Sequence, residues 1–150
     1  MTNDTIQELS LKEIHQRLRE GSLKSRELTE SAIGRYQEDL GAYRDFRKDD
    51  AIEQATLADQ AFRCGTDLGP LQGVPVSVKD LYGLSGTQTF AGSPKALPES
   101  FEKEGPVVSS LRSQHSVFTG KTHTVEFAFG GLGVNTHWGT PRNPWDAETH

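Results

Sequence analysis

Hydrophobic residues follow two different periods along this chain. Up to about residue 64, apolar positions recur every three or four residues, which is the spacing of amphipathic helices. The expected buried stripes are Leu11, Ile14 and Leu18; then Leu28, Ala32, Ile33 and Tyr36; then Ala55, Ala58 and Phe62. Beyond Gly69-Pro70 the period changes to two, which favours strands. We therefore expect helices in residues 1–65 and strands with loops in residues 66–150.

Polar residues mark where the predicted helices begin and end. Ser10 and Glu13 have the spacing of a capping box, in which each side chain binds the other's backbone amide, and Gly21 follows as a stop. Ser25 is the predicted N-cap of the second helix. The third is expected to open at Asp50 and to run to Gly65.

The second half of the chain predicts a strand, a helix and a strand in that order. Alternating valines over residues 74–78 indicate a strand, and Pro75 confines that strand to an edge, a strand start or a bulge. Pro106 lies where a helix would begin. Residues 117–119 read as the next strand, which ends at Gly120-Lys121-Thr122. This order favours an α/β architecture.

Composition and charge narrow the classes of function. The chain has 16 Lys and Arg against 21 Asp and Glu, a net charge of −5, which has the wrong sign for binding a nucleic-acid backbone. No apolar run is long enough to cross a membrane. Residues 1–5 lack the basic cluster that precedes the apolar stretch of a secretory signal. The single cysteine, Cys64, cannot form an internal disulfide, which fits a reducing compartment. We expect a cytoplasmic protein with neither nucleic acid nor membrane as a direct partner.

Two glycine-containing segments resemble phosphate-binding motifs but fail their spacing. A phosphate loop ending in Gly120-Lys121-Thr122 needs an earlier glycine at position 115, which is His115. A dinucleotide fingerprint that uses Gly131 and Gly133 needs a third glycine at position 136, which is Thr136. Both interpretations are disfavoured.

Metal binding is also disfavoured. One lysine, by contrast, lies where a catalytic base could be placed. His115, His123, His137 and His150 lack the i, i+4 pairing of a helical zinc site. Lys79 follows the valine strand directly, and strand ends are where ligands gather in α/β sheets. A lysine held there without water could lose its proton and act as a base. On this feature alone, a surface lysine at a strand end is the better interpretation.

Four blocks in order closely resemble the amidase signature family. They are Gly69–Asp80, Thr87–Ser93, Gly120–Gly130 and Gly139–Asp146. The helical residues 1–65 resemble the family's N-terminal region less distinctively. The resemblance implies that residues 1–150 are the N-terminal portion of a single amidase-type domain. Its fold would begin with the N-terminal helices and continue with the first strands of a mixed sheet covered by helices.

The resemblance also implies a reaction. The family hydrolyses or transfers carboxamide groups through a Ser–cis-Ser–Lys triad, and Lys79 matches the triad lysine. Phe129 and Gly130 match a segment that lines the acyl pocket. A small-molecule amide is the expected substrate, and no metal or organic cofactor is implied.

The catalytic serines are missing from these 150 residues. In the family they lie in a glycine- and serine-rich block that follows the position of Asp146 by ten or more residues. Ser77, Ser85 and Ser93 lie outside any such block and are no substitutes. We therefore expect this chain alone to be inactive, whether it is part of a longer enzyme or a truncated product.

Two alternatives stay open at this point. The chain could be a noncatalytic interaction fragment, with a complementary chain or a second copy of itself as partner. It could also belong to an amidotransferase A-type subunit, which passes ammonia to a tRNA-bound substrate together with partner subunits. The sequence at Phe129–Gly131 and Gly139–Pro141 resembles stand-alone amidases more closely.

The resemblance carries a last expectation about packing. Most strands of the family's sheet would lie beyond residue 150, so several apolar side chains should lack cover in this chain. They are Val74, Val76, Val78, Val117, Phe118, Phe127 and Phe129.

Overall fold

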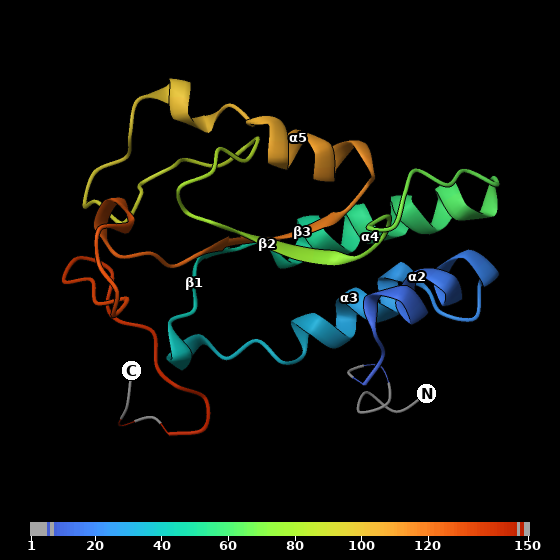
Figure 1. The fold of residues 1–150 in the computed structure, drawn as a ribbon, viewed down its shortest axis with the longest axis horizontal. Coiled ribbons are helices and arrows are strands. Elements are labelled where there is room, and N and C mark those ends of the chain that lie inside the picture. The colour runs from blue at the N-terminus through green and yellow to red at the C-terminus, as the bar shows by residue number, and fades with distance from the viewer. Residues whose placement is uncertain (1–5, 7, 147, 149–150) are drawn as a thin grey trace. The chain divides into compact units, whose positions relative to one another are not determined.

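A computed structural model describes residues 6, 8–146 and 148 of the chain (Figure 1). Its α-helices are α2 (Leu11–Glu20), α3 (Ser25–Ile33), α4 (Lys48–Arg63) and α5 (Pro106–Ser113). Its strands are β1 (Tyr43–Phe46), β2 (Pro75–Lys79) and β3 (Val117–Thr122). Single turns of 3-10 helix are η1 (Glu38–Leu40), η2 (Glu99–Glu102) and η3 (Glu126–Ala128). The predicted α/β class is confirmed.

The three strands form one sheet in the order β1–β3–β2 (Figure 1). β1 runs antiparallel to β3, with Asp45 opposite Lys121, while α5 lies between β2 and β3 in the chain, which gives the expected strand–helix–strand order. Pro75 is both the first residue of β2 and part of an edge strand, as its missing N–H requires. β3 spans Val117–Thr122, so the predicted end of this strand at Gly120-Lys121-Thr122 is confirmed.

The chain divides into two compact units. The first consists of the residues up to Tyr36, Arg47–Val76 and Ser110–Thr119. The second consists of Gln37–Phe46, Ser77–Ser109 and the residues from Gly120 onward. β2 and β3 each contribute residues to both units. The assignment of residues 1–150 to one amidase-type domain stays a prediction.

The first unit contains the predicted helices and their core. The capping box at the start of α2 is confirmed, since Glu13 N–H donates to Ser10 Oγ and the Glu13 carboxylate accepts from Ser10 N–H. The serine hydroxyl, followed by its backbone amide, holds the pKa of Glu13 below its ordinary value. The buried stripe of α2 packs in a cluster with α3 and the residue before β2; its members are Ile6, Ile14, Leu18, Leu23, Leu28 and Val74.

The start of α3 differs from the prediction. Lys24, not Ser25, is the N-cap residue, and the Ser25 hydroxyl donates instead to the carbonyl of Gly73 at 2.7 Å. Asp59 of α4 takes the place of the cap, because its two carboxylate oxygens accept the N–H groups of Ser25 at 2.7 Å and Arg26 at 3.1 Å. An α-helix leaves its first N–H groups without partners, so a carboxylate from another helix can satisfy them. α4 itself begins at Lys48, two residues before the predicted opening.

The expected exposure of the apolar strand residues is wrong in most positions. Val74, Val78, Val117 and Phe118 are buried within this chain. In the first unit, small residues of α4 make this possible, since Ala51 and Ala55 pack directly against Val117. Phe127 and Phe129 are exposed as expected. Within the described residues, every helix is too short or too polar to cross a membrane.

Candidate active site

Lys79 is the last residue of β2, in the second unit. Its carbonyl oxygen accepts the N–H of Leu81 at 2.7 Å and the N–H of Tyr82 at 3.0 Å, so the strand ends in a tight turn. The side chains on either side of it, Val78 and Asp80, are buried, whereas Lys79 is exposed. This alternation follows from extended backbone, in which successive side chains leave on opposite faces. The backbone of Lys79 is therefore held while its side chain is directed away from the core of this unit.

Asp80 carries a buried carboxylate, with 1% of its side chain exposed. One oxygen lies 2.8 Å from the ammonium of Lys121, and the other lies 3.5 Å from Nε of Arg44. The N–H of Phe90 donates to both oxygens, at 3.3 and 3.4 Å. A single carboxylate thus faces two cations, and all these groups belong to the second unit.

Lys121 is completely buried in β3, the central strand of the sheet. Its ammonium donates to Asp80, to Thr89 Oγ1 at 2.7 Å and to the Gln88 carbonyl at 3.1 Å. An ammonium has three donors, so this group is saturated. Burial lowers the pKa of Lys121, and the hydrogen bond and charge of Asp80 oppose that effect.

Arg44 of β1, the second cation beside Asp80, packs against two aromatic rings. Its guanidinium lies 4.0 Å from the ring centre of Phe90 and 5.4 Å from that of Trp138, and the two rings meet edge to face. Cations are attracted to the faces of aromatic rings. Trp138 is held in turn by its indole N–H, which donates to the Ser93 carbonyl at 2.8 Å.

Asn135 joins three loops of the second unit through its side-chain amide. Its Nδ2 donates to the carbonyls of Gly92 at 2.7 Å and Thr124 at 3.0 Å. Its Oδ1 accepts the N–H groups of His137 and Trp138 at 2.8 and 3.0 Å. The sequence offered no signal for this role, because an asparagine in a loop is ordinary and its partners lie far away in the chain.

A groove of about 610 Å³ lies beside Phe129 in the second unit. Its lining residues are Val125, Glu126, Phe127, Phe129, Val134, Asn135, Thr136 and His137. The backbone here is strained, since Phe127 and Ala128 have φ of 49° and 54°, where residues other than glycine are uncommon. Strain of this kind gathers at functional sites. Phe129 lines the groove and Gly130, the next residue, does not.

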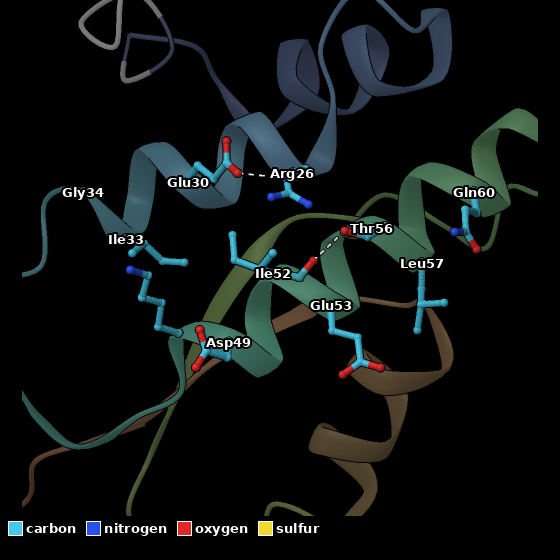
Figure 2. A pocket seen from close by; sticks show the side chains of 11 residues that line it. Arg26, Glu30, Ile33, Gly34, Asp49, Ile52, Glu53, Thr56, Leu57 and Gln60 are labelled. Atoms are coloured by element: carbon cyan, nitrogen blue, oxygen red, sulfur yellow. Dashed lines mark hydrogen bonds and ion pairs between the residues drawn. The ribbon is translucent and has the colours of Figure 1, made fainter.

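A second groove, of about 890 Å³, lies between α3 and α4 in the first unit (Figure 2). Side chains from both helices line it, including the Arg26–Glu30 ion pair on α3 and Ile52 on α4. None of the residues predicted for catalysis or acyl binding lines this groove. We therefore place the candidate site at the end of β2 and not here.

The histidines and the cysteine considered in the sequence do not form a further site among the described residues. The described residues contain no group of three His, Cys, Asp or Glu side chains that could hold a metal ion, and His150 lies outside them. Cys64 is exposed and reduced at the C-cap of α4. The site residue that sequence reasoning missed is Lys121, which was considered only as part of a phosphate loop.

The chain belongs to the Amidase family, whose model matches residues 27–150. It is 51% identical over 136 residues to the 2-amino-5-chloromuconic acid deaminase of Comamonas testosteroni, a match that covers 85% of this chain and 29% of that protein. It is 34% identical over 148 residues to the A-type subunit of the glutamyl-tRNA(Gln) amidotransferase of Syntrophus aciditrophicus, covering 95% of this chain and 30% of that protein. The family resemblance found in the sequence is confirmed.

Solved structures agree with this assignment. A crystal structure described as an amidase matches 93% of this chain and 32% of its own, with 32% identity and a TM-score of 0.85. The peptide amidase of Stenotrophomonas maltophilia matches 93% of this chain and 31% of its own, with 27% identity and a TM-score of 0.80. The chain thus spans less than one third of the relatives it matches.

Proposed function

We propose that the complete protein containing this chain hydrolyses the C–N bond of a carboxamide, with Lys79 as the base of a Ser–cis-Ser–Lys triad. The observation that carries this proposal is the place of Lys79: a fixed strand end inside the family's first matching block, with its side chain exposed. Lys121 is not a candidate for the catalytic base, because its ammonium already donates to three acceptors. Among the described residues, the Lys79 ammonium has no hydrogen bond or ion pair.

The proposed reaction needs two serines from outside these 150 residues. Lys79 takes a proton from the bridging serine, which takes one from the nucleophilic serine as that oxygen attacks the amide carbon. The C–N bond then breaks, and the nitrogen leaves with a proton as ammonia or an amine. Water releases the acyl group as a carboxylic acid. An amine acts as a base only when neutral, and exclusion of water favours that form. The proposal therefore requires the rest of the protein to cover Lys79.

We further propose that Phe129 and Gly130 contribute to binding the acyl group. The groove beside Phe129 is open and partly apolar, and its strained backbone supports a functional role. Phe129 is 94% exposed, and a large apolar side chain in that state gains most from contact with an apolar substrate or with another part of the protein.

One relative favours a second candidate function. The deaminase named above is 51% identical to this chain, whereas the A-type subunit of the amidotransferase is 34% identical. The second candidate is therefore release of ammonia from an unsaturated amino dicarboxylic acid such as 2-amino-5-chloromuconic acid. Both candidates break a C–N bond, so release of ammonia measures either when the amide substrate is a primary carboxamide. A role within an amidotransferase would instead require partner subunits for activity.

Replacement of Lys79 in the complete protein tests the proposal. Ammonia release is measured with acetamide, benzamide and 2-amino-5-chloromuconic acid for the wild type, for Lys79→Ala and for Lys95→Ala, which removes another exposed lysine. We expect Lys79→Ala to lose activity by about 10²–10⁴-fold, the range for loss of a general base, and Lys95→Ala to retain it. Undiminished activity in Lys79→Ala would refute the assigned role. Residues 1–150 alone should give no turnover above background.

A further inference from the structure

We propose that Asp80 and Lys121 form a positioning pair that fixes the end of β2 and thereby sets the direction in which the Lys79 side chain leaves the sheet. This inference rests on the proposed function and adds two residues to its site. The proposed reaction gives neither of them a chemical step. Both are nevertheless buried beside the residue on which the reaction depends.

The pair is joined to the backbone that directly follows Lys79. The N–H of Asp80 donates to the Thr122 carbonyl at 3.0 Å, which ties the end of β2 to the end of β3. The Asp80 side chain binds Lys121, the residue before Thr122, at 2.8 Å. Main chain and side chain thus make two separate links between the same two strand ends. The carbonyl of Lys79 is held by the turn that follows.

The same pair holds the loop that passes beside the strand ends. Lys121 donates to the Gln88 carbonyl and to Thr89 Oγ1, while Asp80 accepts the N–H of Phe90. Thr89 Oγ1 donates onward to the Phe101 carbonyl at 3.0 Å. Three consecutive loop residues are therefore fixed by two side chains, so the loop and the strand end cannot move independently.

This arrangement controls Lys79 because the side chains of Lys79 and Asp80 leave the backbone on opposite faces, one exposed and one buried. In extended backbone, the side chain of one residue fixes the orientation of the next. With Asp80 drawn inward by Lys121 and Arg44, Lys79 must point outward. If the Asp80 carboxylate were released, the strand end could rotate and carry Lys79 with it.

A purely stabilising role explains the pair poorly. A buried ion pair is weak evidence for stability, because the cost of removing two charges from water offsets their attraction. Apolar residues of similar size often stabilise a core as well or better. What apolar residues cannot supply is the set of directed hydrogen bonds to Gln88, Thr89 and Phe90. Directed hydrogen bonds fix the position of the strand end, and a catalytic base such as Lys79 must be held in a fixed position to act.

The test uses the complete protein and the compound, among acetamide, benzamide and 2-amino-5-chloromuconic acid, with the highest wild-type kcat/KM. Lys121→Met and the double variant Asp80→Asn with Lys121→Met are compared with the wild type. The double variant leaves neither charge of the pair buried and keeps an acceptor for Phe90. We expect kcat to fall about 100-fold in both, as for a catalytic group displaced by about 1 Å, with KM changed less than about threefold. Val108→Ala is the control, since it removes buried apolar volume on α5, which supplies none of the hydrogen-bond or ion-pair partners of Asp80 and Lys121.

The outcomes are distinct. Wild-type kcat in a folded Lys121→Met or double variant would overturn the inference and leave the proposed function intact. An equal loss of kcat in Val108→Ala would also overturn it, because a general loss of stability would then suffice. If neither variant folds, Asp80→Glu decides the matter: it keeps the charge and displaces the carboxylate by one methylene, so reduced kcat supports the inference and unchanged kcat refutes it. Failure of the proposed function shows separately, as full activity in Lys79→Ala.

Discussion

Among single residues, Gly120 shows how closely two strands can approach. Its φ is +137°, a conformation that other residues rarely adopt, and a Cβ placed there would overlap the carbonyl oxygen of Asp45 on β1. The next residue in β3 is Lys121, which lies opposite Asp45 of β1 and binds the carboxylate of Asp80.

We predict that Gly120→Ala lowers the free energy of unfolding by roughly 2–4 kcal/mol, at the upper end for single substitutions, because β1 must move away from β3. Urea denaturation followed by circular dichroism measures the change. Gly131→Ala is the matched control, since nothing lies within 4 Å of its added Cβ, and it should change stability by less than about 0.5 kcal/mol. Equal effects of the two substitutions would contradict the argument.

The two lysines of the site differ in how far the sequence could predict them. Lys79 was proposed from the sequence because its neighbours carry the signal: a run of alternating valines before it and the family's block around it. The burial of Lys121 depends on a carboxylate 41 positions earlier, on Thr89 and on the Gln88 carbonyl. Partners so distant in sequence leave no local pattern, and the glycine before Lys121 pointed to a phosphate loop instead.

At the level of elements, α3 depends on a residue of another helix. Asp59 of α4 accepts the N–H groups of Ser25 and Arg26, which otherwise have no acceptor in their own helix. A negative charge at a helix N-terminus is also favoured by the helix dipole. α3 and α4 are therefore linked by a cap as well as by apolar packing.

We predict that Asp59→Ala destabilises the protein by about 1–2 kcal/mol, the usual cost of losing an N-cap acceptor. Asp59→Asn should cost less, because the amide oxygen can still accept one bond. Thermal unfolding measures both, and Glu53→Ala on the exposed face of α4 serves as the control. A stability for Asp59→Ala equal to that of the control would show that the cap contributes nothing.

Elements with local signals were predicted well, and the others were not. α2 carries its own capping box and stop, and β2 its alternating valines, so both lie within a residue of their predicted ends. Ser25 was predicted as the N-cap of α3 because the true acceptor, Asp59, is 34 positions away. β1 was missed because its sequence, with two charged residues between aromatics, becomes a strand only by pairing with β3.

For the whole molecule, the family is established, and the proposed chemistry requires segments outside these residues. The chain covers 29% of the deaminase relative and 32% of the matching amidase structure. The α/β class and the family could be predicted from the sequence, because four ordered blocks lie within residues 69–146. The full site could not, since the proposed mechanism takes its two serines from outside these 150 residues.

The exposed apolar side chains of the second unit fit this description. Phe129 is 94% exposed and Trp145 91%, whereas the strand residues Val117 and Phe118 are fully covered. Large apolar side chains gain about 1.5–3 kcal/mol each on burial. We infer that the apolar side chains still to be buried by other parts of the protein are Phe129 and Trp145. The sheet residues Val117 and Phe118, which the sequence prediction named, are already buried.

A crystal structure of the complete protein would test the role of Lys79 most directly. We expect Lys79 Nζ to lie within hydrogen-bond distance, about 2.7–3.2 Å, of a serine hydroxyl from the glycine- and serine-rich block, in a site closed to water. We also expect Asp80 and Lys121 to keep their contact beneath it. A structure in which the Lys79 side chain extends into bulk solvent, with no serine near it, would contradict its assignment as the catalytic base.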